Sequence, residues 1–97
     1  MLRGKKMFCP ELRDWVFTDH AQWEMERRGI TKDEVNSVLN APEQKEEIRP
    51  GRCVYQSRLT YGEPPKVYLL RVFVEIDRMP PEVVTVYRTS KVKKYWR

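Results

Sequence analysis

The single histidine of the chain, His20, has neighbours with which it could perform acid–base chemistry. Positions 20, 24 and 28 fall on one stripe of an α-helix, so His20, Glu24 and Arg28 are expected to line up, with Arg27 beside them. A carboxylate next to an imidazole fixes its tautomer and raises its proton affinity, which suits a general acid or base. A structural histidine in the first helical turn, bonded to a strand carbonyl, fits the same pattern.

A second candidate, Arg71, interrupts residues 67–76, the most apolar stretch of the sequence. A charge within such a strand needs either a partner or an exposed face. An ion pair with Glu75 or Glu24 is one interpretation, and a phosphate clamp built on the planar guanidinium is the other. Tyr87 lies in the middle of the next predicted strand, where its hydroxyl would orient a substrate or donate a proton.

Both ends of the sequence are basic, while the middle is mildly acidic. The net charge is +5; residues 1–6 carry three basic side chains and residues 83–97 carry five, with no acid in either segment. Basic side chains interleaved with aromatic rings suit a phosphate backbone and stacked bases. We expect nucleic-acid contacts from Arg88, Lys91, Lys94 and Tyr95. The alternative is a frayed, solvated tail.

The composition excludes several classes of site. One histidine and two cysteines do not supply a zinc site of the usual four-ligand kind unless carboxylates or a second chain contribute, and no Walker loop or G-x-G-x-x-G occurs. We therefore expect no metal and no cofactor. No apolar run of about 18 residues is present, so no membrane span is expected. Two thiols without a signal peptide predict a cytoplasmic protein with a buried thiol at Cys53 and an exposed one at Cys9.

Helix caps identify two helical segments in the first half of the chain. The first begins at Thr18 or Asp19 and ends at Gly29, which suits the left-handed position after a helix. The second begins with Thr31 and Glu34 at capping-box spacing. These segments are residues 19–28 and 31–40.

Three strands are predicted in the second half, at residues 52–59, 66–76 and 83–89. Their short connections indicate an antiparallel meander. The polar residues 42–50 are interpreted as a lead-in to the sheet, and residues 15–17 as an edge strand or a docked N-terminal segment. The predicted fold is α+β: an N-terminal helical hairpin packed on one face of a three- to four-stranded antiparallel sheet. It forms one domain over residues 1–97, with a basic lead-in at 1–14 and a basic aromatic tail at 90–97.

Alternation along the strands predicts which side chains meet the helices. The expected core consists of Met25, Val35, Val38, Leu39, Leu70, Val72, Val74, Val84 and Val86. The opposite sheet face would carry Leu69, Arg71, Phe73, Glu75, Thr85, Tyr87 and Thr89. That second face is either a working surface or is covered by the C-terminal tail.

The segment FTDHAQWEMERRGITKDEVNSVLNAP resembles a small, mostly bacterial domain family of unknown function with the pattern T-x-H-A-x-x-R-M-x-x-R-G-I. The later segments GRCVYQ and VVTVY also resemble it, so the similarity spans about residues 17–87. Glu24 stands where the family tends to have arginine. The residues that match the first pattern are Thr18, His20, Ala21, Met25, Arg28, Gly29 and Ile30.

This family is distantly similar to the RelE/ParE-like toxins, in which a helical hairpin packs on an antiparallel sheet. Many of those proteins are metal-independent ribonucleases, and others inhibit proteins. The resemblance implies an RNA-directed domain, a metal-independent endoribonuclease toxin module with an antitoxin-like partner. His20 would then be the acid or base, Arg28 and Arg71 would hold the phosphate, and Tyr87 would orient the substrate or donate a proton.

Two other functions fit the same residues. One is a non-catalytic module that binds nucleic acid or protein through its basic ends. The other is a structural or oligomeric domain in which the T-x-H-A motif is only a helix start.

A functional centre would have to gather His20, Arg28, Arg71 and Tyr87. His20 and Arg28 are separated by about 12 Å along the helix, which matches neighbouring phosphates better than one small anion. Because the helices should cover the other sheet face, the two halves meet only at a rim of the sheet. We expect a partly exposed His20 there, with a strand tyrosine or arginine within hydrogen-bonding distance.

Overall fold

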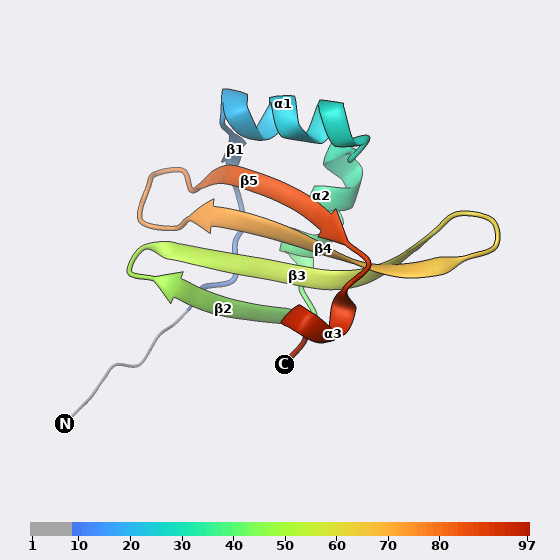
Figure 1. Cartoon of the computed structure of the whole chain (residues 1–97). Coiled ribbons are helices and arrows are strands. Elements are labelled where there is room, and N and C mark those ends of the chain that lie inside the picture. The colour runs from blue at the N-terminus through green and yellow to red at the C-terminus, as the bar shows by residue number, and fades with distance from the viewer. Residues whose placement is uncertain (1–8) are drawn as a thin grey trace.

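The first half of the chain forms two long helices in the computed structural model, which describes residues 9–97 (Figure 1). The first begins where the Thr18 side chain accepts a hydrogen bond from the Ala21 amide, and it ends at Gly29, whose φ is 68°. The second begins with a capping box between Thr31 and Glu34. They are α1 (Asp19–Arg28) and α2 (Lys32–Asn40), so both predicted helices are confirmed, with Thr18 as the first N-cap.

Five strands form one sheet, in the order β1-β5-β4-β3-β2. They are β1 (Val16–Phe17), β2 (Gln44–Arg49), β3 (Arg52–Tyr61), β4 (Lys66–Glu75) and β5 (Glu82–Thr89). β1 runs parallel to β5, and the other neighbours are antiparallel. The predicted three to four strands are therefore too few. The additional strand β2 was missed because its sequence, QKEEIR, lacks apolar alternation; it is an edge strand with one neighbour.

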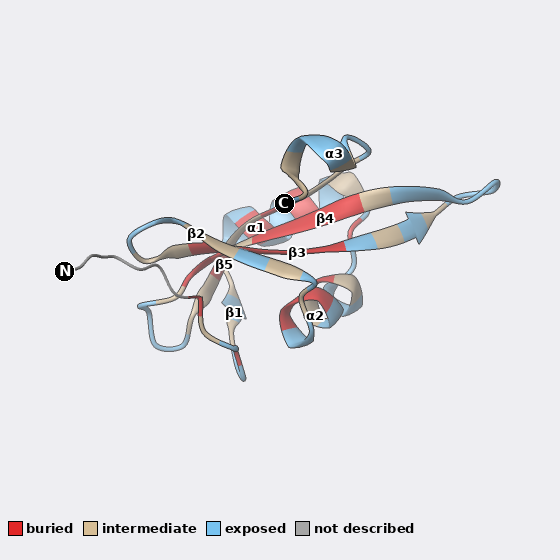
Figure 2. Ribbon diagram, turned by 90° about the horizontal axis from the view of Figure 1, so that it is seen from below, coloured by how far each residue is buried: buried red, intermediate tan, exposed pale blue. Residues whose placement is uncertain are grey.

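The helices do not pack together on one sheet face as predicted. α2 lies against β3 and β4, whereas α1 lies along β5 at the sheet edge (Figure 1). This edge is open to α1 because β1 pairs only with Glu82 and Val83 at the start of β5. A short third helix, α3 (Val92–Tyr95), lies on the sheet face opposite α2 (Figure 2).

The core lies between the sheet and the two long helices, and all but one of its predicted members are buried. The exception is Val84, which is half-buried, while Val83 is fully buried in its place. Phe73 is opposite Thr85 but Val74 is opposite Val83, so the register shifts between them. An extra residue at such a bulge reverses the in–out alternation, which the sequence does not reveal.

Cys9 and Cys53 form a disulfide, so the predicted pair of free thiols is wrong. Both residues are buried, and their Cα atoms are 5.9 Å apart. The Tyr55 hydroxyl also donates a hydrogen bond of 2.6 Å to the Pro10 carbonyl. The segment before β1 is thus held against β3 at two points, which explains why Cys9 is not exposed as expected.

Neither a membrane-spanning helix nor a cluster of metal-binding side chains occurs among the described residues. None of the helices within residues 9–97 has the length and apolarity needed to cross a membrane. The same residues contain no group of three or more His, Cys, Asp or Glu side chains placed to hold a metal ion. The basic side chains at Arg3, Lys5 and Lys6 lie outside the described residues.

Candidate functional site

Glu24 and Arg28 on α1 bind the backbone of β5 where that strand lacks a strand neighbour. A Glu24 carboxylate oxygen accepts a hydrogen bond of 3.2 Å from the Val86 amide, and the Arg28 guanidinium donates one of 2.9 Å to the Val86 carbonyl. The two side chains are themselves 3.5 Å apart. Together they satisfy the backbone groups that an adjacent strand would otherwise pair. Glu24 therefore has a structural function that needs an acceptor at this position.

His20 lies at the opposite end of α1 from Arg28. Its Nε2 atom is 3.4 Å from Glu24, its ring stacks on Trp23 with centroids 6.0 Å apart, and its side chain is 62% exposed. Among the described residues, these polar and ring contacts are all with its own helix. The structure therefore places His20 at an exposed rim, as expected, but it does not bring a strand tyrosine or arginine into hydrogen-bonding contact with it.

Arg71 is at the centre of the sheet face opposite α2. The register places Gln56, Arg71 and Tyr87 directly side by side on β3, β4 and β5. Arg71 Nε donates a hydrogen bond of 2.9 Å to Gln56 Oε1, and Arg71 Nη1 donates one of 2.7 Å to the Tyr87 hydroxyl. The guanidinium carbon lies 4.2 Å from the centre of the Tyr95 ring. The predicted pairing of Arg71 with Tyr87 thus exists as a direct hydrogen bond.

The charge on Arg71 has no acidic partner within residues 9–97. Glu75 pairs instead with Arg49 and Arg52, and Glu24 pairs with His20 and Arg28. Residues four apart on a strand are about 13 Å apart, unlike those on a helix, which explains why Glu75 does not reach Arg71. Arg71 is only 8% exposed. It is therefore a buried cation whose hydrogen-bond partners are neutral, an arrangement that costs free energy unless an anion compensates it.

A hollow of about 420 Å³ at the edge of β5 is lined by Arg28, Tyr87 and Arg88. Arg88 also donates a hydrogen bond of 3.4 Å to the Gly29 carbonyl, which fixes its stem next to the end of α1. Tyr87 contacts both this hollow and the buried cation: it lines the hollow, and its hydroxyl accepts a hydrogen bond from Arg71. We call Arg28, Arg71, Tyr87 and Arg88 the rim site. It consists of Arg71, which is bonded to the Tyr87 hydroxyl, and of Arg28 and Arg88, which line the hollow with Tyr87.

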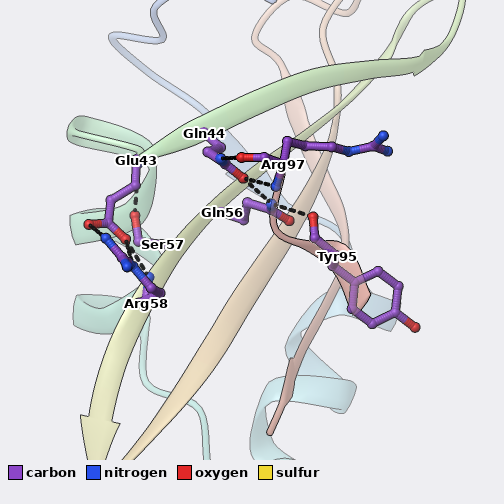
Figure 3. Close-up of polar contacts among 7 residues, drawn as sticks. All are labelled: Glu43, Gln44, Gln56, Ser57, Arg58, Tyr95 and Arg97. Atoms are coloured by element: carbon purple, nitrogen blue, oxygen red, sulfur yellow. Dashed lines mark hydrogen bonds and ion pairs between the residues drawn. The ribbon is translucent and has the colours of Figure 1, made fainter. Parts of the chain in front are cut away.

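The C-terminal residues fold back over this face instead of forming the solvated tail of the alternative prediction. Gln44 donates to the Arg97 carbonyl at 2.8 Å and accepts from the Arg97 amide at 3.2 Å, and Gln56 donates to the Tyr95 carbonyl at 3.1 Å (Figure 3). Arg58, held by Glu43, stacks on Trp96 at 4.1 Å. We call residues 91–97 the strap.

The strap carries three of the four predicted nucleic-acid-binding residues. Lys94 and Tyr95 lie on α3, and Lys91 precedes it, with its amide bonded to Thr89. The pKa of the Tyr95 hydroxyl is lower than usual, first because the Tyr87 hydroxyl hydrogen-bonds to it, and also because Lys94 and Arg71 are positive. Burial acts in the opposite direction. Tyr95 therefore ionises more readily than an isolated tyrosine.

Two residues that contribute here were not predicted from the sequence. Gln56 connects Arg71 to the strap, and Gln44 hydrogen-bonds both Gln56 and Arg97. Their positions follow from strand register, so only a correct pairing of β2, β3 and β4 would have found them.

The comparisons with known proteins identify the family of the chain. The family model described as a domain of unknown function (DUF4258) matches residues 17–88. This range includes α1, α2 and the whole rim site, and it ends before the strap. Neither a curated protein nor a solved structure matches the sequence. The chain therefore belongs to the DUF4258 family of domains of unknown function.

Proposed function

We propose that this domain binds RNA, with a backbone phosphate held at the rim site. The observation that supports the proposal most strongly is the buried Arg71 guanidinium, which has hydrogen bonds to Gln56 and Tyr87 but no carboxylate partner in residues 9–97. A planar guanidinium matches the geometry of a phosphate. Arg28 and Arg88 line the hollow beside it and supply further positive charge.

A nucleic-acid strand fits these surroundings better than a small anion does. The basic groups continue from the rim site to Lys91 and Lys94, with Phe73, Tyr87 and Tyr95 among them. Phosphates attract the cations, and bases stack on aromatic rings. This basic and aromatic surface matches the charge and stacking groups of a flexible single strand.

Metal-independent cleavage of the bound RNA is a second candidate function, and the hydrogen bond from Arg71 to the Tyr87 hydroxyl favours it, because it places a proton-transfer group beside the buried cation. Cleavage requires a base that activates the 2′-hydroxyl, an acid for the leaving oxygen, and cations around the charged phosphorane. Tyr87 would supply one of the two proton-transfer groups, and Arg28, Arg71 and Arg88 would stabilise the charge. His20 is not part of this arrangement. A RelE-like toxin paired with an antitoxin-like protein is the corresponding biological role in this proposal.

Fluorescence anisotropy with a short labelled single-stranded RNA tests the binding proposal. Arg71→Gln should weaken binding about tenfold and reduce its salt dependence between about 50 and 200 mM salt. Arg78→Gln is the matched control, because Arg78 carries the same charge but pairs with Glu82 at an exposed turn. Arg88→Gln removes a surface member of the site, so its effect does not depend on a buried replacement. Equal affinities in Arg71→Gln, Arg88→Gln and Arg78→Gln would refute the site.

Cleavage is tested separately, by incubating the protein with RNA in EDTA. Catalysis at the rim site predicts that Tyr87→Phe slows product formation while His20→Ala does not. The reverse result, or identical rates in all three proteins, would refute this chemistry. RNA that binds but stays intact would leave the domain as a non-catalytic RNA-binding module.

A further inference from the structure

The strap lies directly over the group that the proposed function requires. The Tyr95 ring covers the Arg71 guanidinium at 4.2 Å, and Arg71 is 8% exposed. A phosphate cannot form hydrogen bonds with this guanidinium while the strap is closed, although Arg28 and Arg88 at the hollow remain available. Full engagement of the rim site therefore requires the strap to move.

The contacts that hold the strap against the sheet are weak enough for the strap to detach. No residue of α3 is buried, and a helix of four residues has little stability of its own. The Arg97–Glu46 ion pair joins side chains that are 67% and 42% exposed. The other anchors are hydrogen bonds from Gln44 and Gln56 and the stacking of Arg58 on Trp96. Gln56 is buried, but the remaining anchors are exposed polar contacts, which are weak individually.

The charge of the strap gives RNA a means of opening it. Residues 91–97 contain Lys91, Lys93, Lys94 and Arg97 and no acid. Within the described chain only Arg97 among these four has a carboxylate partner, Glu46. RNA phosphates would give all four cations partners and release the counterions condensed on the RNA. Binding to RNA therefore competes with the closed position of the strap.

We propose that the strap is an RNA-operated cover: it closes the rim site in the free protein, and RNA draws it away and thereby exposes Arg71. This inference rests on the proposed function, because it concerns access to the same site. The closed strap lowers the apparent RNA affinity by the fraction of molecules that are open. Releasing its anchors should therefore strengthen binding. The strap lies outside residues 17–88, the range that the family model matches.

The test releases the anchors on β2 without substituting any residue of the rim site. The double variant Gln44→Ala and Glu46→Gln removes the side chains that hold Arg97. We expect RNA to bind about three- to tenfold more tightly, because the open fraction rises. Glu82→Gln is the control: it makes the same change in net charge, far from the strap, at the residue that pairs with Arg78. It should change affinity less than about twofold.

Each outcome of this titration has a distinct meaning. Tighter binding by the double variant alone, with a faster association rate, supports the cover. Binding that is unchanged or weaker in the double variant, while the parent binds RNA, overturns the cover and leaves the rim site intact. The same gain in Glu82→Gln also overturns it, because the gain then reflects net charge. Failure of every protein to bind RNA, including the parent, refutes the proposed function and the cover together.

Discussion

The hydrogen bond between Glu24 on α1 and the Val86 amide on β5 leads us to expect a large loss of stability in Glu24→Ala. Glu24 is 8% exposed, and its carboxylate accepts the hydrogen bond from the Val86 amide. Removing a charged acceptor from a buried amide costs about 1.5–3 kcal/mol. The ion pairs with His20 and Arg28 involve more exposed partners and add at most about 1 kcal/mol. The midpoints of these two ranges together predict a loss of about 2–3 kcal/mol.

Thermal unfolding followed by circular dichroism measures this loss. In a domain of about 100 residues, each kcal/mol lowers Tm by about 4–8 °C, so Glu24→Ala should unfold about 8–24 °C below the parent. Glu26→Ala is the matched control, because Glu26 is an exposed acid on the same helix. It should shift Tm by only a few degrees, since alanine is itself a good helix former. Similar Tm values for the two variants would refute the assignment of Glu24 as the acceptor that completes the sheet edge.

Three further predictions concern the core and its covalent link. Reduction of the Cys9–Cys53 disulfide, which joins residues 44 apart, should lower the free energy of unfolding by about 4 kcal/mol in urea titrations; an unchanged midpoint would contradict the bond. Val83→Ala should cost about 1–3 kcal/mol and Val84→Ala less than about 1 kcal/mol, because the bulge buries the first; a reversed order in chemical denaturation would contradict the register. Burial raises the pKa of Tyr55 to about 12, so its contribution to stability is complete below about pH 10 and is lost as the pH rises through 12. The difference between the parent and Tyr55→Phe should therefore shrink over that range, and a constant difference would contradict it.

Local signals were sufficient to predict the helices and the three long strands. The capping box of Thr31 and Glu34 needs only neighbouring residues, and Gly29 supplies a conformation that few other residues adopt. Alternation along β4 likewise placed Leu70 and Val72 in the core. These features depend on contacts between residues that are close together in the sequence, so they can be recognised from the sequence alone.

Features that depend on strand register were not predictable in the same way. Because of the bulge near Phe73, Val83 is buried in the core where Val84 was expected. The bulge arises only when β4 and β5 pair. One interpretation paired Arg71 with Glu75 on the same strand face, but side chains four apart on a strand are about 13 Å apart.

The candidate site was predicted in part. Arg28, Arg71 and Tyr87 were placed together at a sheet rim, and the structure brings them together around β5. His20 was expected beside them, but α1 runs along β5 and carries His20 to the other end of the strand. The position of the strap over Arg71 depends on Gln44, which lies 53 residues before Arg97 in the sequence. Contacts at that separation leave no local signal.

The most direct test of the RNA-binding proposal is a nuclear magnetic resonance titration of the labelled protein with short single-stranded RNA. The account predicts that the largest changes occur at the Arg71 Nε–H resonance and at the amides of Tyr87 and Arg88, with further changes along residues 91–97. Changes centred on His20 and Trp23, with Arg71 unaffected at saturating RNA, would contradict it.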